Sequence, residues 1–274
     1  MSTSKEARCA VVVSSVDHFS DIWPQFFHFF FKHWQQPSWP VYLIANYRRF
    51  GDDRVTTLTL GRDRQWGSNL LLALEQIEAD CILYMQDDYL LSAPVNNAFI
   101  QQAAEALHAS PGPYLNLFCP SHETVPVAGL PFDEVNRDLH WYVTLQAALW
   151  KTHTLRELVQ PGWTPWDAET ELNAYGKARG GKGIYTLNKT HADVFPYLQA
   201  VKGGFWLHEA VEFCQQHKVR VNKARRPCPP WGESFWKRKY RSLLKRKMKL
   251  SALLESRLAR NKVVEPLPDS NLQP

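Results

Sequence analysis

The sequence contains no apolar stretch that approaches the roughly 20 residues needed to cross a bilayer. Its longest aromatic run, residues 26–31, is interrupted by His28. The first residues are polar and charged, and the apolar run at 9–13 is too short for the core of a signal peptide. These absences predict a chain without a membrane span, and we expect it to stay in the cytoplasm.

Cysteine is scarce and scattered, because the five cysteines lie far apart at positions 9, 81, 119, 214 and 228. They form no CxxC pair, and no set of Cys and His residues has the spacing of a structural zinc site, which argues against structural zinc and against a disulfide framework. An HExxH metallohydrolase motif is also absent. With 45% apolar and 22% charged residues, a chain of 274 residues still has the material for a globular fold with a sizeable core.

Basic residues are rare relative to acids over most of the chain and crowded in one part of it. Residues 220–262 hold 15 Lys and Arg against 2 acids, whereas the remainder holds 17 basic and 25 acidic residues. An acidic body is therefore joined to a basic segment. Nothing in the body resembles an RRM, a KH domain or a helix-turn-helix, so we expect no nucleic-acid partner.

Short β-branched or apolar runs alternate with helix-like segments through the first half of the chain, a rhythm typical of βα units around a mainly parallel sheet. A helix starting near Ser20 or Asp21 is apolar nearly all round and should be buried. A second is predicted to be capped by Ser68, and a third covers residues 96–108. Strands are predicted at 9–16, 41–45, 55–60, 81–85 and 114–118.

After Pro120 a loop rich in proline, glycine and acids interrupts this rhythm. A strand is then predicted at 141–145, and helices at 152–159 and from Pro165 to near Gly176. We expect an α/β domain over 1–226, with halves at 9–118 and 119–226, followed by a Pro-rich linker and a basic helical tail over 227–274.

Two adjacent carboxylates, Asp87 and Asp88, follow the buried strand predicted at 81–85. In an open α/β sheet the carboxyl ends of the strands line the ligand crevice. Neighbouring like charges repel, and a divalent cation relieves that repulsion while also binding phosphate oxygens. The pair therefore indicates a metal-diphosphate site, although an Asp-Asp pair can also simply open a turn.

The order of the motifs resembles that of GT-A-type glycosyltransferases over roughly residues 9–210. The resemblance is carried by the strand near the amino terminus, by Trp66-Gly67-Ser68-Asn69 opening a helix, and by a strand that ends on Gln86-Asp87-Asp88. It implies a Rossmann-like GT-A sheet flanked by helices, in which a DxD-like acidic motif binds a divalent metal and the sugar-nucleotide diphosphate. This sequence has xDD in place of DxD, so Asp87, Asp88 or both are the implied ligands of Mn²⁺ or Mg²⁺.

The same resemblance implies where the nucleotide sugar lies. Residues at the end of the first strand should border the base and ribose, and residues before and within the helix opened by Trp66 should line the sugar-nucleotide side. The implied nucleotide-sugar-binding residues are Ser14, Ser15, Asp17, Arg62, Asp63, Asn69 and Asp87. For Arg62 the alternative is an ordinary solvated charge in a loop.

An inverting glycosyl transfer also needs a base that takes the proton from the acceptor hydroxyl. Glu169 and Asp167 lie in the first turns of the helix predicted from Pro165, after an aromatic loop, and match the place of the acidic residue in inverting GT-A enzymes. Acids at a helix start are also favoured by the helix dipole without any catalytic role. Both residues are therefore candidate catalytic bases.

Aromatic residues near these acids suit the apolar faces of sugar rings, and Trp163 and Trp166 are the candidate acceptor contacts. Most other aromatics are expected to be core material. Among the histidines, His191 lies in a polar stretch and is the candidate third metal ligand.

The basic segment has Trp236, Tyr240, Leu243 and Leu254 near one helical face and lysines and arginines around the rest. This composition is typical of a helix that lies on an anionic membrane surface, where apolar burial and charge attraction add. A helix that merely exposes its charges to solvent is the alternative. On the first interpretation the protein associates with the inner face of a membrane.

Taken together, the sequence predicts a metal-dependent glycosyltransferase that moves a sugar from a nucleotide-sugar donor to a glycan or lipid-linked acceptor, in the setting of surface polysaccharide biosynthesis. Two alternatives stay open. A nucleotidyltransferase would use similar acids, but its usual Gly-rich, Lys-containing loop after the first strand is absent. A carbohydrate-binding or scaffold protein would keep the fold without turnover.

Overall fold

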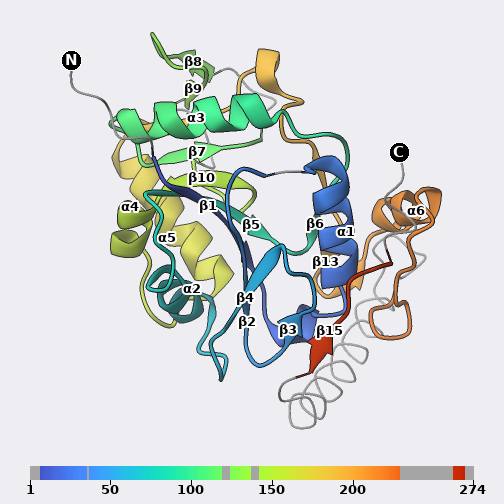
Figure 1. The fold of residues 1–274 in the computed structure, drawn as a ribbon. Helices are drawn as coiled ribbons and strands as arrows, with labels where there is room; N and C mark the ends of the chain where they lie inside the picture. The colour runs from blue at the N-terminus through green and yellow to red at the C-terminus, as the bar shows by residue number, and fades with distance from the viewer. Residues whose placement is uncertain (1–6, 36, 119–123, 137–141, 229–261, 269–274) are drawn as a thin grey trace, which may run out of the picture.

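A computed structural model describes residues 7–35, 37–118, 124–136, 142–228 and 262–268, which form a nine-stranded sheet covered by helices on both faces (Figure 1). The strand order is β4-β2-β1-β5-β10-β7-β11-β9-β8. These strands are β1 (Cys9–Ser14), β2 (Val41–Ala45), β4 (Val55–Thr59), β5 (Cys81–Gln86), β7 (Tyr114–Asn116), β8 (Thr124–Pro126), β9 (Asp133–Val135), β10 (Ala148–Lys151) and β11 (Ile184–Thr186).

The sheet is mainly parallel. Strands β4, β2, β1 and β5 pair in parallel, as do β7 and β11, whereas β10 and β9 run against their neighbours. The predicted α/β class is thereby confirmed. Strands β1 and β5 are in register from Cys9 opposite Cys81 to Ser14 opposite Gln86, so their carboxyl ends meet at the same edge of the sheet.

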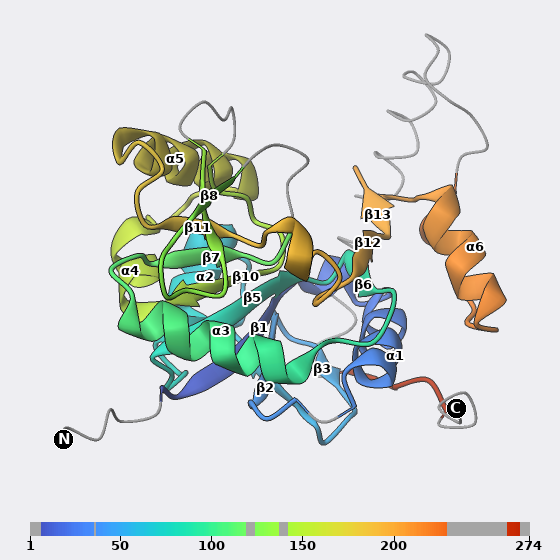
Figure 2. The same ribbon diagram turned by 90° about the horizontal axis from the view of Figure 1, so that it is seen from above.

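Two hydrophobic clusters, one on each face of the sheet, hold the helices in place. Because side chains alternate along a strand, Val11 and Val13 of β1 belong to one cluster and Ala10 and Val12 to the other. Figure 2 shows α3 and α5 on opposite sides of β7 and β10. The first cluster includes α1 (Trp23–His33), α3 (Asn97–Ala109) and α6 (His208–Gln216), and the second includes α2 (Trp66–Leu74), α4 (Thr152–Leu158) and α5 (Pro165–Ala178).

Helix α1 is buried on nearly all sides, as its apolar sequence predicts. Its phenylalanines Phe26, Phe27, Phe29 and Phe30 are each at most 1% exposed. It packs between the sheet and α6, and the rings of Phe29 and Phe213 lie 4.6 Å apart. This helix fixes the segment that follows β1 and therefore one wall of the cleft described below.

The strand predicted at 141–145 is wrong, because the described residues 142–147 form no strand and β10 begins only at Ala148. Side chains of α5 accept the hydrogen bonds that a neighbouring strand would have taken. The Tyr142 N–H donates to Asn173 Oδ1 at 2.5 Å, and the Leu145 N–H donates to Glu169 Oε1 at 3.3 Å. The alternation of side chains there reflects packing against a helix.

The predicted cap of α2 is also wrong. Ser68 lies inside the first turn, where its hydroxyl accepts a hydrogen bond from the Gly162 N–H at 2.9 Å. The N-cap position is Gln65, whose φ of 74° is unusual for a residue with a side chain. Gly67 is needed in this turn, because a Cβ there would lie 2.3 Å from the Gln160 carbonyl oxygen.

Smaller pairings complete the described fold. Strand β15 (Val263–Val264) pairs in parallel with β3 (Arg49–Phe50), and the Gly51 N–H donates to the Val264 carbonyl at 2.9 Å. Strand β6 (Tyr89–Leu91) pairs with β12 (Tyr197–Gln199). Strand β13 (Val201–Lys202) forms a hairpin with β14 (Phe205–Trp206).

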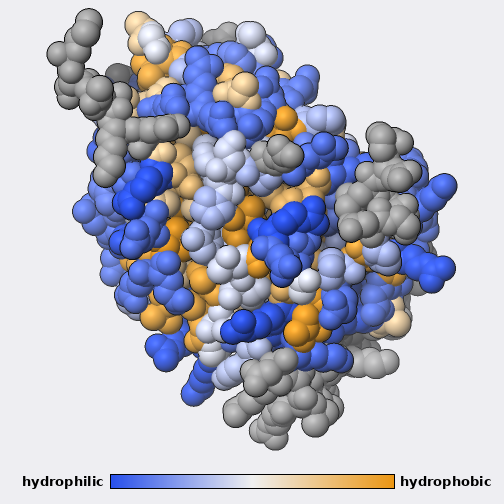
Figure 3. Space-filling model, in the orientation of Figure 1, coloured by the Kyte–Doolittle hydropathy of each residue, from blue (hydrophilic) through white to orange (hydrophobic). Residues whose placement is uncertain are grey.

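The predicted basic helix lies almost wholly within residues 229–261, outside the described residues. In the part of the chain that is described, no helix combines the length and apolarity of a membrane span. On the face seen in Figure 3, polar side chains are interspersed with small apolar patches.

Candidate active site

A cleft of about 680 Å³ opens where the carboxyl ends of β1 and β5 meet. One wall is formed by the segment after β1 and the loop before α2, and another by the first turns of α5 and the β13–β14 hairpin. The lining residues are Ser14, Ser15, Val16, His18, Phe19, Asp63, Gln65, Trp66, Asn69, Gln86, Asp87, Asp88, Tyr89, Pro165, Trp166, Glu169, Gln199, Val201, Lys202, Gly203 and Gly204. Both residues of the Asp-Asp pair thus line this cleft, together with Glu169.

Asp87 lies directly after β5 and is only 5% exposed. The register of β1 with β5 places Ser15 beside it, and the Ser15 hydroxyl donates a hydrogen bond to Asp87 Oδ2. Trp23 Nε1 donates to the same hydroxyl at 2.7 Å, which orients it. Burial, and then the neighbouring charge of Asp88, raise the pKa of Asp87 well above its usual range.

Asp88 has one carboxylate oxygen for which the described residues supply no hydrogen-bond partner. Its Oδ1 is buried and accepts no hydrogen bond from any residue that the structure describes. Its backbone is held in place, since the Ala200 N–H donates to the Asp88 carbonyl at 2.7 Å. Burial raises the pKa of Asp88 to about 7. Leaving a buried carboxylate oxygen unpaired is costly, so the geometry favours a cationic ligand at this point.

The two aspartates fit a hard divalent cation, which takes oxygen ligands. Within the described residues, no group of three or more His, Cys, Asp or Glu side chains is arranged to hold a metal. Mg²⁺ sites in proteins commonly use one or two carboxylates together with water and substrate phosphates. The donor set therefore suits a cation that arrives with a phosphate-bearing substrate.

His191 is not among the residues that line the cleft. Its ring stacks on Phe99 with the centroids 4.3 Å apart, and its Nδ1 lies 3.0 Å from Asn188 Oδ1. These contacts give no support to His191 as a third metal ligand.

The predicted donor-side residues separate into two groups. Ser14, Ser15, Asp63 and Asn69 line the cleft, whereas Arg62 is exposed and does not. Asp63 Oδ1 accepts hydrogen bonds from Asn69 Nδ2 at 2.8 Å and from the Gln65 N–H at 3.0 Å. Asp63 and Asn69 therefore shape the loop before α2 as well as facing the cleft.

Asp17 does not line the cleft either, because its carboxylate turns toward the loop after β2. It accepts backbone hydrogen bonds from Asn46, Tyr47 and Arg48 at 3.0–3.2 Å. Asp17 therefore joins the end of β1 to the end of β2.

The two candidate bases also occupy different positions. Glu169 faces the cleft, and its Oε1 accepts only the long hydrogen bond from Leu145 among the bonds found in the described part of the chain. Asp167 instead completes a capping box with Thr164 and is exposed. Hydrogen bonds from Thr164, the backbone one first, lower the pKa of Asp167. A carboxylate held as a helix cap with a low pKa is a poor general base.

The two tryptophans differ in the same way. Trp166 lines the cleft and is 75% exposed, so its indole is available at the mouth. Trp163 is partly buried against the cluster that holds α2 and α5. Its carbonyl accepts a hydrogen bond from the Gly67 N–H at 2.9 Å. Trp163 is thus a packing residue in this structure.

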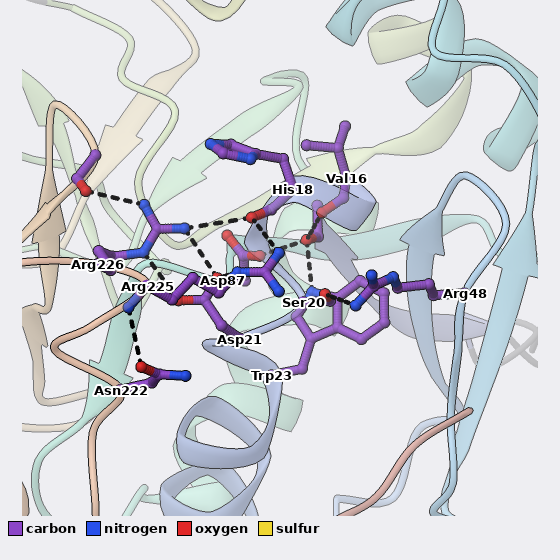
Figure 4. A network of polar contacts seen from close by, with 12 residues as sticks. Val16, His18, Ser20, Asp21, Trp23, Arg48, Asp87, Asn222, Arg225 and Arg226 are labelled. Atoms are coloured by element: carbon purple, nitrogen blue, oxygen red, sulfur yellow. Dashed lines mark hydrogen bonds and ion pairs between the residues drawn. The ribbon is translucent and has the colours of Figure 1, made fainter. Parts of the chain in front are cut away.

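Several cleft residues were not identified from the sequence. The β13–β14 hairpin contributes Lys202, Gly203 and Gly204, and its Gly-Gly turn was a usable signal. Behind the cleft, Arg225 and Arg226 converge on Asp21 (Figure 4). These two arginines belong to the basic residues counted at 220–262. Composition alone does not show which of those residues form a buried ion pair and which are exposed to solvent.

Comparisons with known proteins give structural matches only. No protein-family model matches the chain, and no curated protein matches its sequence. TarS residues 1–349 from S. aureus, in complex with UDP-GlcNAc, is 15% identical with a TM-score of 0.47, over 79% of this chain and 68% of that one. In another structure of the same TarS fragment, the match covers 69% of this chain and 59% of the fragment.

Two other matched structures are also glycosyltransferase structures. The mannosyltransferase from Pyrobaculum calidifontis with GDP-Man and Mn²⁺ is 15% identical with a TM-score of 0.45, over 73% of this chain and 59% of that one. Glucosyl-3-phosphoglycerate synthase from Mycobacterium tuberculosis is 9% identical with a TM-score of 0.43, over 72% and 73% of the two chains.

Proposed function

We propose that this chain is a metal-dependent glycosyltransferase that moves a sugar from a nucleotide-sugar donor to a glycan or lipid-linked acceptor. The observation that carries the proposal is the pair at the carboxyl end of β5, in which Asp87 is buried and Asp88 has a buried Oδ1 with no hydrogen-bond partner among the described residues, both lining one cleft. Surface polysaccharide biosynthesis is the setting we infer from the resemblance.

The donor diphosphate would lie against the aspartates. Asp87 and Asp88 would hold Mn²⁺ or Mg²⁺, which supplies neutralising charge to the departing nucleoside diphosphate. Lys202 lines the same cleft and supplies a further positive charge for phosphate. The Ser14–Val16 segment and the loop containing Asp63 and Asn69 would border the nucleoside and the sugar.

The acceptor would enter past Trp166. An exposed indole at the mouth of a cleft offers an apolar face to a sugar ring. Glu169, one turn along α5 and facing the same cleft, would take the proton from the attacking hydroxyl. The preference for Glu169 over Asp167 follows from the capping role of Asp167.

Release of nucleoside diphosphate from sugar donors tests the proposal. We expect one donor to yield nucleoside diphosphate in the presence of Mn²⁺ and an acceptor glycan, with EDTA stopping the reaction. The same nucleoside diphosphate with Mn²⁺ should stabilise the protein by about 2.7 kcal/mol at 100 times its Kd. A protein that binds the nucleotide with no turnover would be a scaffold, and one that binds none would contradict the proposal.

For the basic segment we propose contact with an anionic membrane surface, as its composition indicates. Replacing Lys237, Arg238 and Lys239 by glutamine should reduce cosedimentation with vesicles that contain anionic lipid, because each surface cation contributes about 1 kcal/mol. Vesicles of neutral lipid are the control. Equal sedimentation of both proteins with anionic vesicles would contradict the proposed contact.

A further inference from the structure

Two walls of the cleft come from distant parts of the chain and are joined behind it by one side chain. The first is the segment after β1, whose His18 and Phe19 line the cleft. The second is the β13–β14 hairpin, whose turn residues Gly203 and Gly204 line it from the other side. Arg226 contacts both.

The Arg226 side chain is 1% exposed and makes several directed contacts (Figure 4). Its Nε and Nη2 donate to the two carboxylate oxygens of Asp21 at 3.2 and 3.1 Å. Its Nη1 donates to the Gly204 carbonyl at 3.1 Å, and its Nη2 reaches the His18 carbonyl at 3.4 Å. The guanidinium also lies over the Phe19 ring at 4.5 Å. The planar guanidinium group, with its N–H donors at fixed angles, can make all of these hydrogen bonds at once, whereas a lysine ammonium cannot.

The hairpin depends on such an attachment. Each strand has two residues, and the turn between them is Gly203-Gly204 with φ of 59° and 89°, a conformation that glycine adopts readily. A two-stranded hairpin of this length is not stable by itself in water. In the described part of the chain, other anchors of the hairpin include hydrogen bonds from the Trp206 N–H to the Pro227 carbonyl at 3.0 Å and from the Leu207 N–H to the Ala200 carbonyl at 2.9 Å. The side chains of Val201, Phe205 and Trp206 are buried, whereas the turn between the strands is held by Arg226 at the Gly204 carbonyl.

We propose that Arg226 is a positioning residue for the donor nucleotide: it ties the hairpin Val201–Trp206 to the segment after β1, so that Lys202 and the glycine turn face the diphosphate at a fixed distance. The inference rests on the proposed function for the identity of the ligand. The attachment itself is a property of the free protein and can be measured without any ligand.

The arginine beside it provides a matched control. Arg225 also pairs with Asp21, at 3.3 Å, and reaches the His18 carbonyl at 3.4 Å, and its side chain is 24% exposed. None of the hydrogen bonds found in the described residues joins Arg225 to Gly204. A variant at position 226 therefore removes the contact that holds the hairpin at Gly204, whereas a variant at position 225 leaves that contact in place.

Hydrogen exchange of the full-length protein tests the attachment. The Arg226→Lys variant keeps the positive charge but loses the guanidinium group and its several donors. We expect the Trp206 and Leu207 amides to exchange at least 10-fold faster in this variant, with the exchange rates of the β1 and β5 amides unchanged. Arg225→Gln should leave the hairpin amides near the wild-type rate. Unchanged exchange in Arg226→Lys, or equal acceleration in both variants, would overturn the proposal.

A second variant covers the case in which Arg226→Lys does not fold. In Asp21→Asn combined with Arg226→Gln the two buried charges are removed together, and the charge of Arg225, which loses Asp21 as its partner, lies on a side chain that is 24% exposed to solvent. The same acceleration at the hairpin is expected from this double variant, and its absence counts against the attachment.

Kinetics separates positioning from a general loss of stability. We expect the donor KM of Arg226→Lys to rise about 10-fold while kcat at saturating donor and the acceptor KM stay within about twofold, since the lost contact acts on donor binding. A fall in kcat with no change in donor KM would contradict the positioning role. If wild-type protein binds no nucleotide yet Arg226→Lys loosens the hairpin, the proposed function fails and the attachment stands.

Discussion

Replacement of Asp88 by asparagine is expected to lower kcat/KM by about 10³-fold and to remove the Mn²⁺-dependent part of nucleoside diphosphate binding. The amide keeps the size of the side chain but loses the negative charge that would hold the cation. Loss of electrostatic stabilisation at a leaving group typically costs this much. Steady-state kinetics and a thermal shift with nucleoside diphosphate, with and without Mn²⁺, measure the two effects. Asp53→Asn, at an exposed position, is the control.

In the metal-free protein, Asp88→Asn should increase the stability of the fold at high pH. Burial raises the folded-state pKa of Asp88 to about 7, so the folded protein binds more protons than the unfolded chain between pH 4 and 7. Stability is therefore lost as the pH rises through this window. Asp88→Asn has no such charge to bury, and at pH 8 the metal-free variant should melt a few degrees above wild type. A metal-free variant that melts below wild type at pH 8 would show that the Asp88 charge is compensated by other groups.

Replacement of Glu169 by glutamine is expected to lower kcat by about 10²–10⁴-fold while leaving donor binding intact, because a general base acts on the acceptor proton. Glutamine keeps an oxygen that accepts the hydrogen bond from the Leu145 N–H, so the segment before β10 that contains Leu145 stays in place. The thermal shift with nucleoside diphosphate and Mn²⁺ should match wild type. Turnover of donor and acceptor at saturation is the measurement.

Asp167→Asn distinguishes the two candidate bases. It weakens the capping box with Thr164 and should lower the melting temperature slightly, with kcat nearly unchanged. The opposite pattern, with activity lost at 167 and retained at 169, would assign the base to Asp167 and contradict our interpretation of the cleft.

The sequence predicted most of what is local. The β-branched run 9–13 and the bulky run 81–85 are strands β1 and β5, and Asp87-Asp88 follows β5 as the motif order indicated. Such features depend on short-range patterns, namely side-chain alternation and the position of charges at strand ends. The buried character of α1 was equally readable, because its apolar residues cover every side.

What the sequence did not predict depends on distant partners. The contact between Asp21 and Arg226 spans 205 positions, and neither residue stands in a recognisable motif. Asp17 was predicted as ligand-facing, yet its carboxylate accepts backbone hydrogen bonds from the loop after β2 and does not line the cleft. Residues 141–145 alternate like a strand in the sequence, but the described part of this segment is hydrogen-bonded to side chains of α5, since tertiary contacts decide between two structures of similar local preference.

The most direct test of the central claim is anomalous diffraction at the manganese edge from crystals grown with Mn²⁺ and the nucleoside diphosphate that stabilises the protein. The account predicts a single peak in the cleft, about 2–2.6 Å from an oxygen of Asp88 or Asp87 and bridged to the diphosphate. A nucleotide bound in the cleft with no metal peak at these carboxylates, or a peak held by other residues, would contradict it.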